Sequence, residues 1–234
     1  MENIYFLTAF VWFASFLFST TVHEAMHAFA AWKLGDPTAY HGGQVSLSPV
    51  PHVAREPIGM LVLPLITSFT QGWAIGWASA PYDPHWAARY PKRAAAMAAA
   101  GPVGNFLIAL AAFALLRGGL EAGWFTAPDR VRFESLVEVA NAGPSFMTTL
   151  LSVLLVQNVF LGVFNLLPLP PLDGASVLRG FATGRFAEMF DSLTTSPAFS
   201  IVGLIVAWRV FPLFAGQLFF VVLAALHPEI TYGN

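Results

Sequence analysis

The chain has 234 residues, of which 56% are hydrophobic and only 10% are charged, whereas soluble domains carry about 25% charged residues. This composition is typical of a membrane protein, and the apolar segments of spanning length predict one integral-membrane domain over residues 1–234. The net charge of −2, without a basic patch, indicates no nucleic-acid partner. The absence of cysteine excludes disulfides, thiolate metal ligands and a cysteine nucleophile.

The first predicted element is a long apolar helix from Ile4 to about Lys33, which ends at the break Gly35-Asp36-Pro37. No basic segment precedes this apolar run, so we expect the N-terminus to be retained rather than cleaved. From Thr38 to Arg55 the chain is polar, punctuated by Gly and Pro, and roughly alternating. This pattern favours short strands or a hairpin over a helix.

The later segments are mostly apolar. Residues 58–77 are interrupted by proline and glycine, which predicts either a kinked span or a re-entrant hairpin. Residues 94–116 and 146–167 are uninterrupted spans, a short amphipathic helix follows at 176–190, and residues 199–226 supply one or two final segments. The predicted fold is therefore an all-α polytopic membrane protein. It is a bundle of about five to six transmembrane or re-entrant segments with a short strand-like, membrane-associated loop.

The first helix carries an HExxH motif formed by His23, Glu24 and His27. Residues four apart lie on one face of a helix, so both imidazoles can bind one Zn²⁺, and Glu24 beside them can act as a general base. The alternative is a pair of interhelical histidines. Random placement of these residue types would give only about 0.005 such matches in a chain of this composition, which favours the metal site.

A catalytic zinc usually has three protein ligands and one open position. Asp173 is the candidate third ligand, because it follows the apolar span 146–167 at a proline-rich break where irregular backbone would line a site. The alternative is that Asp173 simply caps the helix that follows it.

Three motifs together resemble the site-2 protease family of intramembrane zinc metalloproteases. They are His23-Glu24-Ala25-Met26-His27, Gly101-Pro102-Val103-Gly104-Asn105, and the run from Asn165 through Leu172-Asp173-Gly174. Further similarity, over Gly35-Asp36-Pro37-Thr38, Ser46-Leu47-Ser48-Pro49, His52 and Leu63-Pro64-Leu65, is to the short bacterial and archaeal branch. The chain departs from the family pattern at Gly43 and Ala175, and its 234 residues contain no PDZ or CBS domain.

The resemblance implies an intramembrane zinc endopeptidase of a prokaryotic cell membrane that cleaves transmembrane protein substrates. It implies one Zn²⁺ per chain bound by His23, His27 and Asp173, with Glu24 as the catalytic acid and base.

Asn105 and Asn165 match polar positions that would contact the substrate or its oxyanion. His52 would either line the site or make an interfacial hydrogen bond. Two other readings remain open, a membrane protein that binds or transports metal and a catalytically inactive scaffold.

The motifs also constrain topology. His23 and Asp173 both lie towards the exit ends of their spans, so the two spans must run parallel to share one zinc. Residues 58–77 should then not cross the membrane once. On that topology seven of the Lys and Arg residues lie on the zinc side and three on the other, which predicts a zinc site towards the cytoplasm. We also expect Thr38–Pro49 to offer a strand edge to the substrate, and Gln157 and Asn158 to form interhelical hydrogen bonds.

Overall fold

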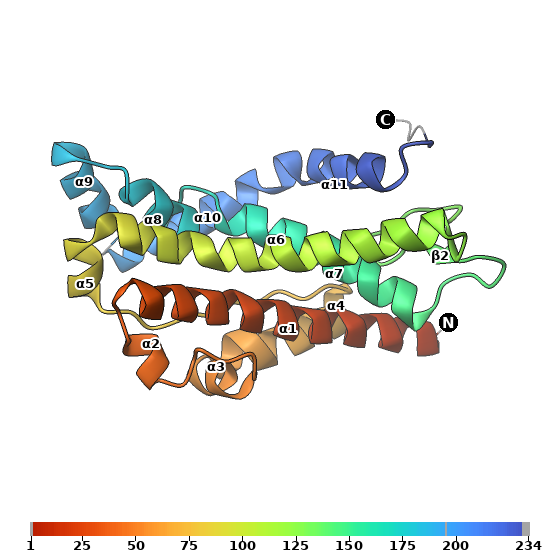
Figure 1. The fold of residues 1–234 in the computed structure, drawn as a ribbon, viewed down its shortest axis with the longest axis horizontal. Helices are drawn as coiled ribbons and strands as arrows, with labels where there is room; N and C mark the ends of the chain where they lie inside the picture. The colour runs from red at the N-terminus through yellow and green to blue at the C-terminus, as the bar shows by residue number, and fades with distance from the viewer. Residues whose placement is uncertain (1, 195, 231–234) are drawn as a thin grey trace.

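Three long helices form the centre of the molecule in the computed structural model, which describes residues 2–194 and 196–230. They are α1 (Glu2–Leu34), α6 (Pro91–Glu121) and α7 (Phe146–Asn165), and all three are long and apolar enough to cross a membrane. Figure 1 shows them lying side by side along the long axis of the molecule. The all-α polytopic fold predicted from the sequence is confirmed.

Helices α1 and α7 run parallel, and α6 runs antiparallel to both. Val11 and Trp12 of α1 pack with Val153 of α7, and further along both helices Ser19 accepts a hydrogen bond from Asn158. Contacts between α1 and α6 run in the opposite order, since His27 meets Met97 whereas His23 meets Asn105. The predicted parallel arrangement of the two ligand-bearing spans is therefore present.

The segment between residues 58 and 83 enters the bundle and returns to the same end. A π-helical turn η1 (Ile58–Val62) and helix α4 (Leu63–Gln71) lead inward, and residues 72–83, which form neither helix nor strand, lead back. We call residues 72–83 the return segment. The return is fixed by a 3.1 Å hydrogen bond from the Trp77 N–H to the Gly59 carbonyl. Gly76 allows this contact, because a Cβ there would lie 2.1 Å from the Gly59 oxygen. The segment is re-entrant and does not cross once, as the topology argument required.

Residues 38–55 correct the expectation of strands. They form two short helices, α2 (Thr38–His41) and α3 (Val50–Arg55), joined by turns. Pro37 and Pro49 stand directly before these helices, and the alternating residues between them have no neighbouring strand with which to pair. In the part of the chain that the structure describes, strands occur only between α6 and α7, as the antiparallel pair β1 (Phe125–Thr126) and β2 (Glu138–Val139).

The remaining helices are α5 (Pro84–Arg89), α8 (Asp173–Arg179), α9 (Gly184–Thr194), α10 (Pro197–Val210) and α11 (Pro212–Leu226). Only Phe211 separates α10 from α11. Helix α11 ends beside the C-terminal end of α6, where Arg117 donates a 3.1 Å hydrogen bond to the Leu226 carbonyl. At the opposite end of the bundle, buried Asp36 accepts hydrogen bonds from the backbone of Thr38 and Asp83, which joins the end of α1 to the start of α5.

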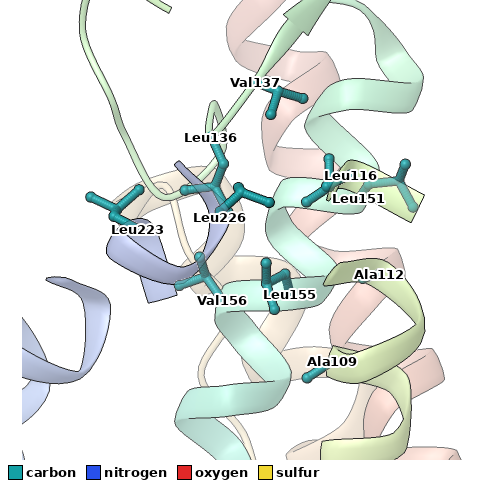
Figure 2. Close-up of a cluster of buried hydrophobic side chains, with 10 residues drawn as sticks. All are labelled: Ala109, Ala112, Leu116, Leu136, Val137, Leu151, Leu155, Val156, Leu223 and Leu226. Atoms are coloured by element: carbon teal, nitrogen blue, oxygen red, sulfur yellow. The ribbon is translucent and has the colours of Figure 1, made fainter. Parts of the chain in front are cut away.

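The largest cluster of buried apolar side chains lies between α6, α7, α11 and the connection that contains β1 and β2 (Figure 2). We call it the distal core. Its members are Ala109, Ala112, Leu116, Leu136, Val137, Leu151, Leu155, Val156, Leu223 and Leu226. Leu116, Leu136 and Leu226 are completely buried. This cluster fixes the ends of the helices that lie away from the HExxH motif.

Candidate metal centre

The two histidines of the HExxH motif face each other from successive turns of α1. Their Nε2 atoms are 2.9 Å apart, and both residues are 7% exposed. The spacing of four residues gives this arrangement directly, because 3.6 residues complete one helical turn.

Asp173 reaches the same point from α8. Its Oδ2 atom lies 3.1 Å from the Nε2 of His23, and its Oδ1 atom lies 3.3 Å from the Nε2 of His27. The preceding turn is tight, since a Cβ on Gly174 would lie 2.2 Å from the Leu166 carbonyl oxygen. Leu172, rather than Asp173, occupies the N-cap position of α8, and no side chain caps that helix end. The helix-cap reading of Asp173 is therefore not what the structure shows.

The tautomers of the two imidazoles favour a cation between them. His27 Nδ1 lies 2.8 Å from the Met97 carbonyl, which can only accept, so this nitrogen carries a proton. His23 Nδ1 lies 2.6 Å from Asn105 Oδ1, which also accepts. When both rings are neutral and carry their proton on Nδ1, each Nε2 atom has a lone pair. The two lone pairs then face each other across 2.9 Å and repel. A metal ion between the two Nε2 atoms would turn that repulsion into two coordinate bonds.

The distances among the donor atoms fit zinc. Tetrahedral coordination at about 2.0–2.1 Å separates neighbouring ligand atoms by about 3.3 Å. The two Nε2 atoms are 2.9 Å apart, and the contacts from His23 Nε2 to Asp173 Oδ2 and from His27 Nε2 to Asp173 Oδ1 are 3.1 and 3.3 Å. Among the described residues, Asp173 Oδ2 has no hydrogen-bond partner. A metal ion at this point would bind the ionised carboxylate of Asp173.

Glu24 lies beside the ligands without taking part in the cluster of three. Its side chain is 4% exposed, and no described residue gives its Oε2 atom a hydrogen bond. Glu24 nevertheless lines the cavity onto which His23, His27 and Asp173 open. A buried carboxylate oxygen without a partner is costly in a protein interior, so Glu24 stands beside the candidate ligands at an energetic cost.

A buried polar network holds His23 in place. Asn105 of α6 is fully buried, and its Oδ1 atom lies 2.6 Å from His23 while its Nδ2 atom donates to Asn158 of α7 at 2.8 Å. Asn158 in turn donates to Ser19 of α1 at 2.8 Å. The expected interhelical hydrogen bonds are confirmed for Asn158 but not for Gln157, whose Oε1 atom is buried without a partner among the described residues. Asn105 uses both of its polar atoms in this network, so the geometry favours orientation of His23 over the predicted contact with substrate.

The other predicted residues lie in different surroundings. Asn165 lines the cavity, and its Nδ2 atom donates to the Leu161 carbonyl at 3.0 Å. His52 is 1% exposed on α3, its Nε2 atom lies 3.0 Å from the Ser46 carbonyl, and it is not part of the cavity lining. The structure therefore brings Asn165 to the site and leaves His52 outside it.

Gly101 is a site residue that the sequence reasoning did not single out. A Cβ at this position would lie 2.3 Å from His27 Nε2 and 2.6 Å from His23 Nε2. The glycine therefore lets α6 pack directly against the metal ligands. The available signal was a Gly-Pro pair in the middle of an apolar span, a position where glycine normally weakens a helix.

His23, His27 and Asp173 open onto a cavity of about 770 Å³ between α1, α6, α7, α8 and the return segment. We call it the catalytic cavity. Residues 75–80 of the return segment form a continuous part of its wall. The cavity is therefore large enough to hold a stretch of polypeptide, and the backbone of residues 75–80 runs along one side of it.

The family model of "Peptidase family M50" matches residues 11–208, a range that holds every residue of the metal centre. The chain belongs to this family. The predicted site-2 protease resemblance is confirmed. No solved structure matches the chain.

Curated relatives of this family member come from bacteria. It is 31% identical over 161 residues to "Putative zinc metalloprotease YwhC" of Bacillus subtilis, covering 69% of this chain and 64% of the relative. It is 29% identical over 193 residues to "Putative zinc metalloprotease Rip2" of Mycobacterium tuberculosis, covering 82% of this chain and 64% of the relative. The chain thus spans less than two thirds of the length of these relatives.

Proposed function

We propose that this M50 family member is an intramembrane zinc endopeptidase that hydrolyses peptide bonds in transmembrane protein substrates. The observation that carries the proposal is the convergence of His23, His27 and Asp173 within 4.8 Å of one another, beside the unpartnered carboxylate oxygen of Glu24. This is the donor set of a catalytic zinc site, with three protein ligands and room for a fourth. We propose one zinc per chain.

Zinc, when bound, supplies a Lewis acid that polarises the scissile carbonyl and lowers the pKa of water to about 7. Glu24 then accepts one proton from the attacking water through its free Oε2 atom. The water oxygen bonds to the carbonyl carbon, the C–N bond breaks, and Glu24 returns the proton to the leaving amine. Asn165, which lines the catalytic cavity, would hydrogen-bond the substrate carbonyl or backbone.

The return segment suits a substrate in an extended conformation. No backbone-to-backbone hydrogen bond within the described residues involves positions 78–82, while residues 78–80 line the catalytic cavity. A transmembrane segment that unwinds for cleavage exposes N–H and C=O groups, which need partners in a water-poor site. Pairing along residues 78–80 would supply them. We therefore propose that residues 78–80, rather than Thr38–Pro49, offer a strand edge to the substrate.

The central test compares wild type with Glu24→Gln on a model transmembrane peptide in detergent or liposomes. We expect zinc-dependent cleavage by wild type and a loss of at least 10³-fold in the variant, in line with the loss of a general base, with bound zinc unchanged. Zinc flux into liposomes without peptide cleavage would favour a transporter. Zinc binding without either activity would favour an inactive scaffold.

We further propose that the metal centre lies towards the cytoplasm of a prokaryotic cell membrane. The re-entrant path of residues 58–77 keeps Lys33, Arg55, Arg89, Lys92, Arg93, Arg179 and Arg185 at the zinc end, against Arg117, Arg130 and Arg132 at the other. Single cysteines at Tyr82 and Asp129, both exposed in the structure, would report the orientation. Labelling of Tyr82→Cys only from the cytoplasm and of Asp129→Cys only from outside is expected, and the reverse pattern would overturn the assignment.

A further inference from the structure

A second cavity, of about 270 Å³, adjoins the catalytic cavity and takes no part in the chemistry described above. We call it the side cavity. It lies between α1, the return segment, α7 and the α10–α11 junction, and its wall includes Trp12, Trp73, Phe160, Phe211 and Ala215. An apolar cavity of about 150 Å³ is already large enough to bind benzene. The side cavity can therefore hold an aromatic ring.

The side cavity is continuous with the proposed substrate path. Six residues line both cavities, namely Phe16, Ile75, Gly76, Leu161, Phe164 and Trp208. The return segment passes from one to the other, with residues 73–76 on the side cavity and residues 75–80 on the catalytic cavity. A peptide that lies along the return segment would thus pass both cavities.

The distance between the cavities can be expressed in substrate residues. Phe16 and Trp12 precede His23 by 7 and 11 positions on α1, which corresponds to about 10 and 16 Å along the helix axis. An extended peptide advances about 3.3 Å per residue. The side cavity therefore lies about three to five substrate residues from the bond held at the metal centre.

One amide interrupts the apolar lining. Gln157 is 5% exposed, and its Oε1 atom has no hydrogen-bond partner among the described residues. The neighbouring Asn158, by contrast, is fully bonded within the interhelical network. Trp12, on the same wall, also leaves its Nε1 atom without a partner in the described chain. Leaving a buried polar group unpaired costs about 1–3 kcal/mol. An occupant whose hydroxyl group meets the Gln157 oxygen, once that amide turns towards the cavity, would therefore be favoured over a purely apolar one.

We propose that the side cavity binds one aromatic side chain of the substrate, three to five residues from the cleaved bond, and that Gln157 makes tyrosine a better occupant than phenylalanine. The inference rests on the proposed function and adds a specificity determinant to it. Gln157 contacts the recognised side chain and has no role in proton transfer.

The test uses model transmembrane peptides with alanine around the cleaved bond and a single tyrosine moved one position at a time on either side. For the intact wild-type protein we expect cleavage to rise at least tenfold when the tyrosine reaches one position three to five residues from the cut. Phenylalanine there should give a smaller rise. Gln157→Leu should lower the cleavage rate of the tyrosine peptide to that of the phenylalanine peptide, so that the ratio of the two rates falls to about one.

Ala215→Phe fills the cavity and should remove the preference for either aromatic residue while zinc content and cleavage of the all-alanine peptide persist. Ala224→Phe, a matched change at an exposed position of the same helix, should retain the preference. If the cleavage rate of wild type did not depend on the position of the tyrosine, the proposal would be overturned while proteolysis itself remained. The same conclusion would follow if both Gln157→Leu and Ala215→Phe kept the wild-type preference for the aromatic peptides. A zinc-loaded wild type that cleaves no peptide would instead overturn the proposed function itself.

Discussion

The two ends of the helical bundle use buried polar groups differently. At the distal end the helices meet through the apolar distal core, with Leu116, Leu136 and Leu226 completely buried (Figure 2), and the buried Ser152 beside it bonds to backbone groups. At the metal end the same three helices meet through buried polar groups, among them Asn105 and Asn158. The packing of the distal core fixes the positions of the helices, whereas the polar groups of the metal end fix the orientation of the metal ligands.

This difference has an energetic consequence. Apolar burial is non-directional and tolerates small shifts, while a metal site needs each ligand to be oriented closely. Changes at the metal end should therefore alter zinc affinity and catalysis with little effect on folding. Changes in the distal core should alter the free energy of unfolding with little effect on zinc.

The largest effect is expected from Gly101→Ala. The added methyl group would lie only 2.3 Å from His27 Nε2 and 2.6 Å from His23 Nε2, and hydrogen bonds to Asn105 and Met97 hold the two rings in place. We expect zinc affinity to fall at least 10³-fold, about 4 kcal/mol, as measured by chelator competition. Gly118→Ala on the same helix, where a Cβ meets nothing within 4 Å, is the control. Equal zinc affinity in both variants would contradict the proposed packing.

Leu116→Ala tests the opposite end. Removal of a completely buried leucine from the distal core should lower the free energy of unfolding by about 2–4 kcal/mol, with zinc affinity of the folded protein unchanged. Denaturant unfolding in detergent would measure the free energy of unfolding, and chelator competition would measure the zinc affinity. A large loss of zinc affinity would show that the two ends are not independent.

A smaller effect is expected from Asn105→Ala. The substitution removes the acceptor from His23 Nδ1 but none of the three ligands. Loss of such a supporting group typically lowers metal affinity or activity 10–100-fold. Zinc titration of this variant, with Asn165→Ala alongside, would separate orientation of the ligand from contact with the substrate. If Asn105→Ala bound zinc normally and lost only activity, the original prediction of a substrate contact would regain support.

The sequence was most informative where function depends on local spacing. The separation of His23 and His27 sets their shared face of α1, and the proline-rich break stands before Asp173, which the fold brings within 3.3 Å of both histidines. Pro64, Gly72 and Gly76 indicated the re-entrant path. These features follow from helix geometry and backbone chemistry, which depend on neighbours in the chain.

Features that depend on partners distant in the chain were missed. The alternation near Gln44 predicted strands, yet no neighbouring strand pairs with it, and turns form instead. The closeness of Gly101 to both histidines depends on how α6 packs against α1. The engagement of both polar atoms of Asn105 depends in addition on α7. Packing distances of this kind cannot be read from one sequence.

X-ray absorption at the zinc edge of the purified protein tests the central claim most directly. The account predicts one zinc per chain with two imidazole nitrogens and carboxylate oxygen at about 2.0–2.1 Å, and loss of that oxygen with weaker binding in Asp173→Ala. A zinc shell that Asp173→Ala leaves unchanged, or a wild-type protein that binds no zinc, would contradict it.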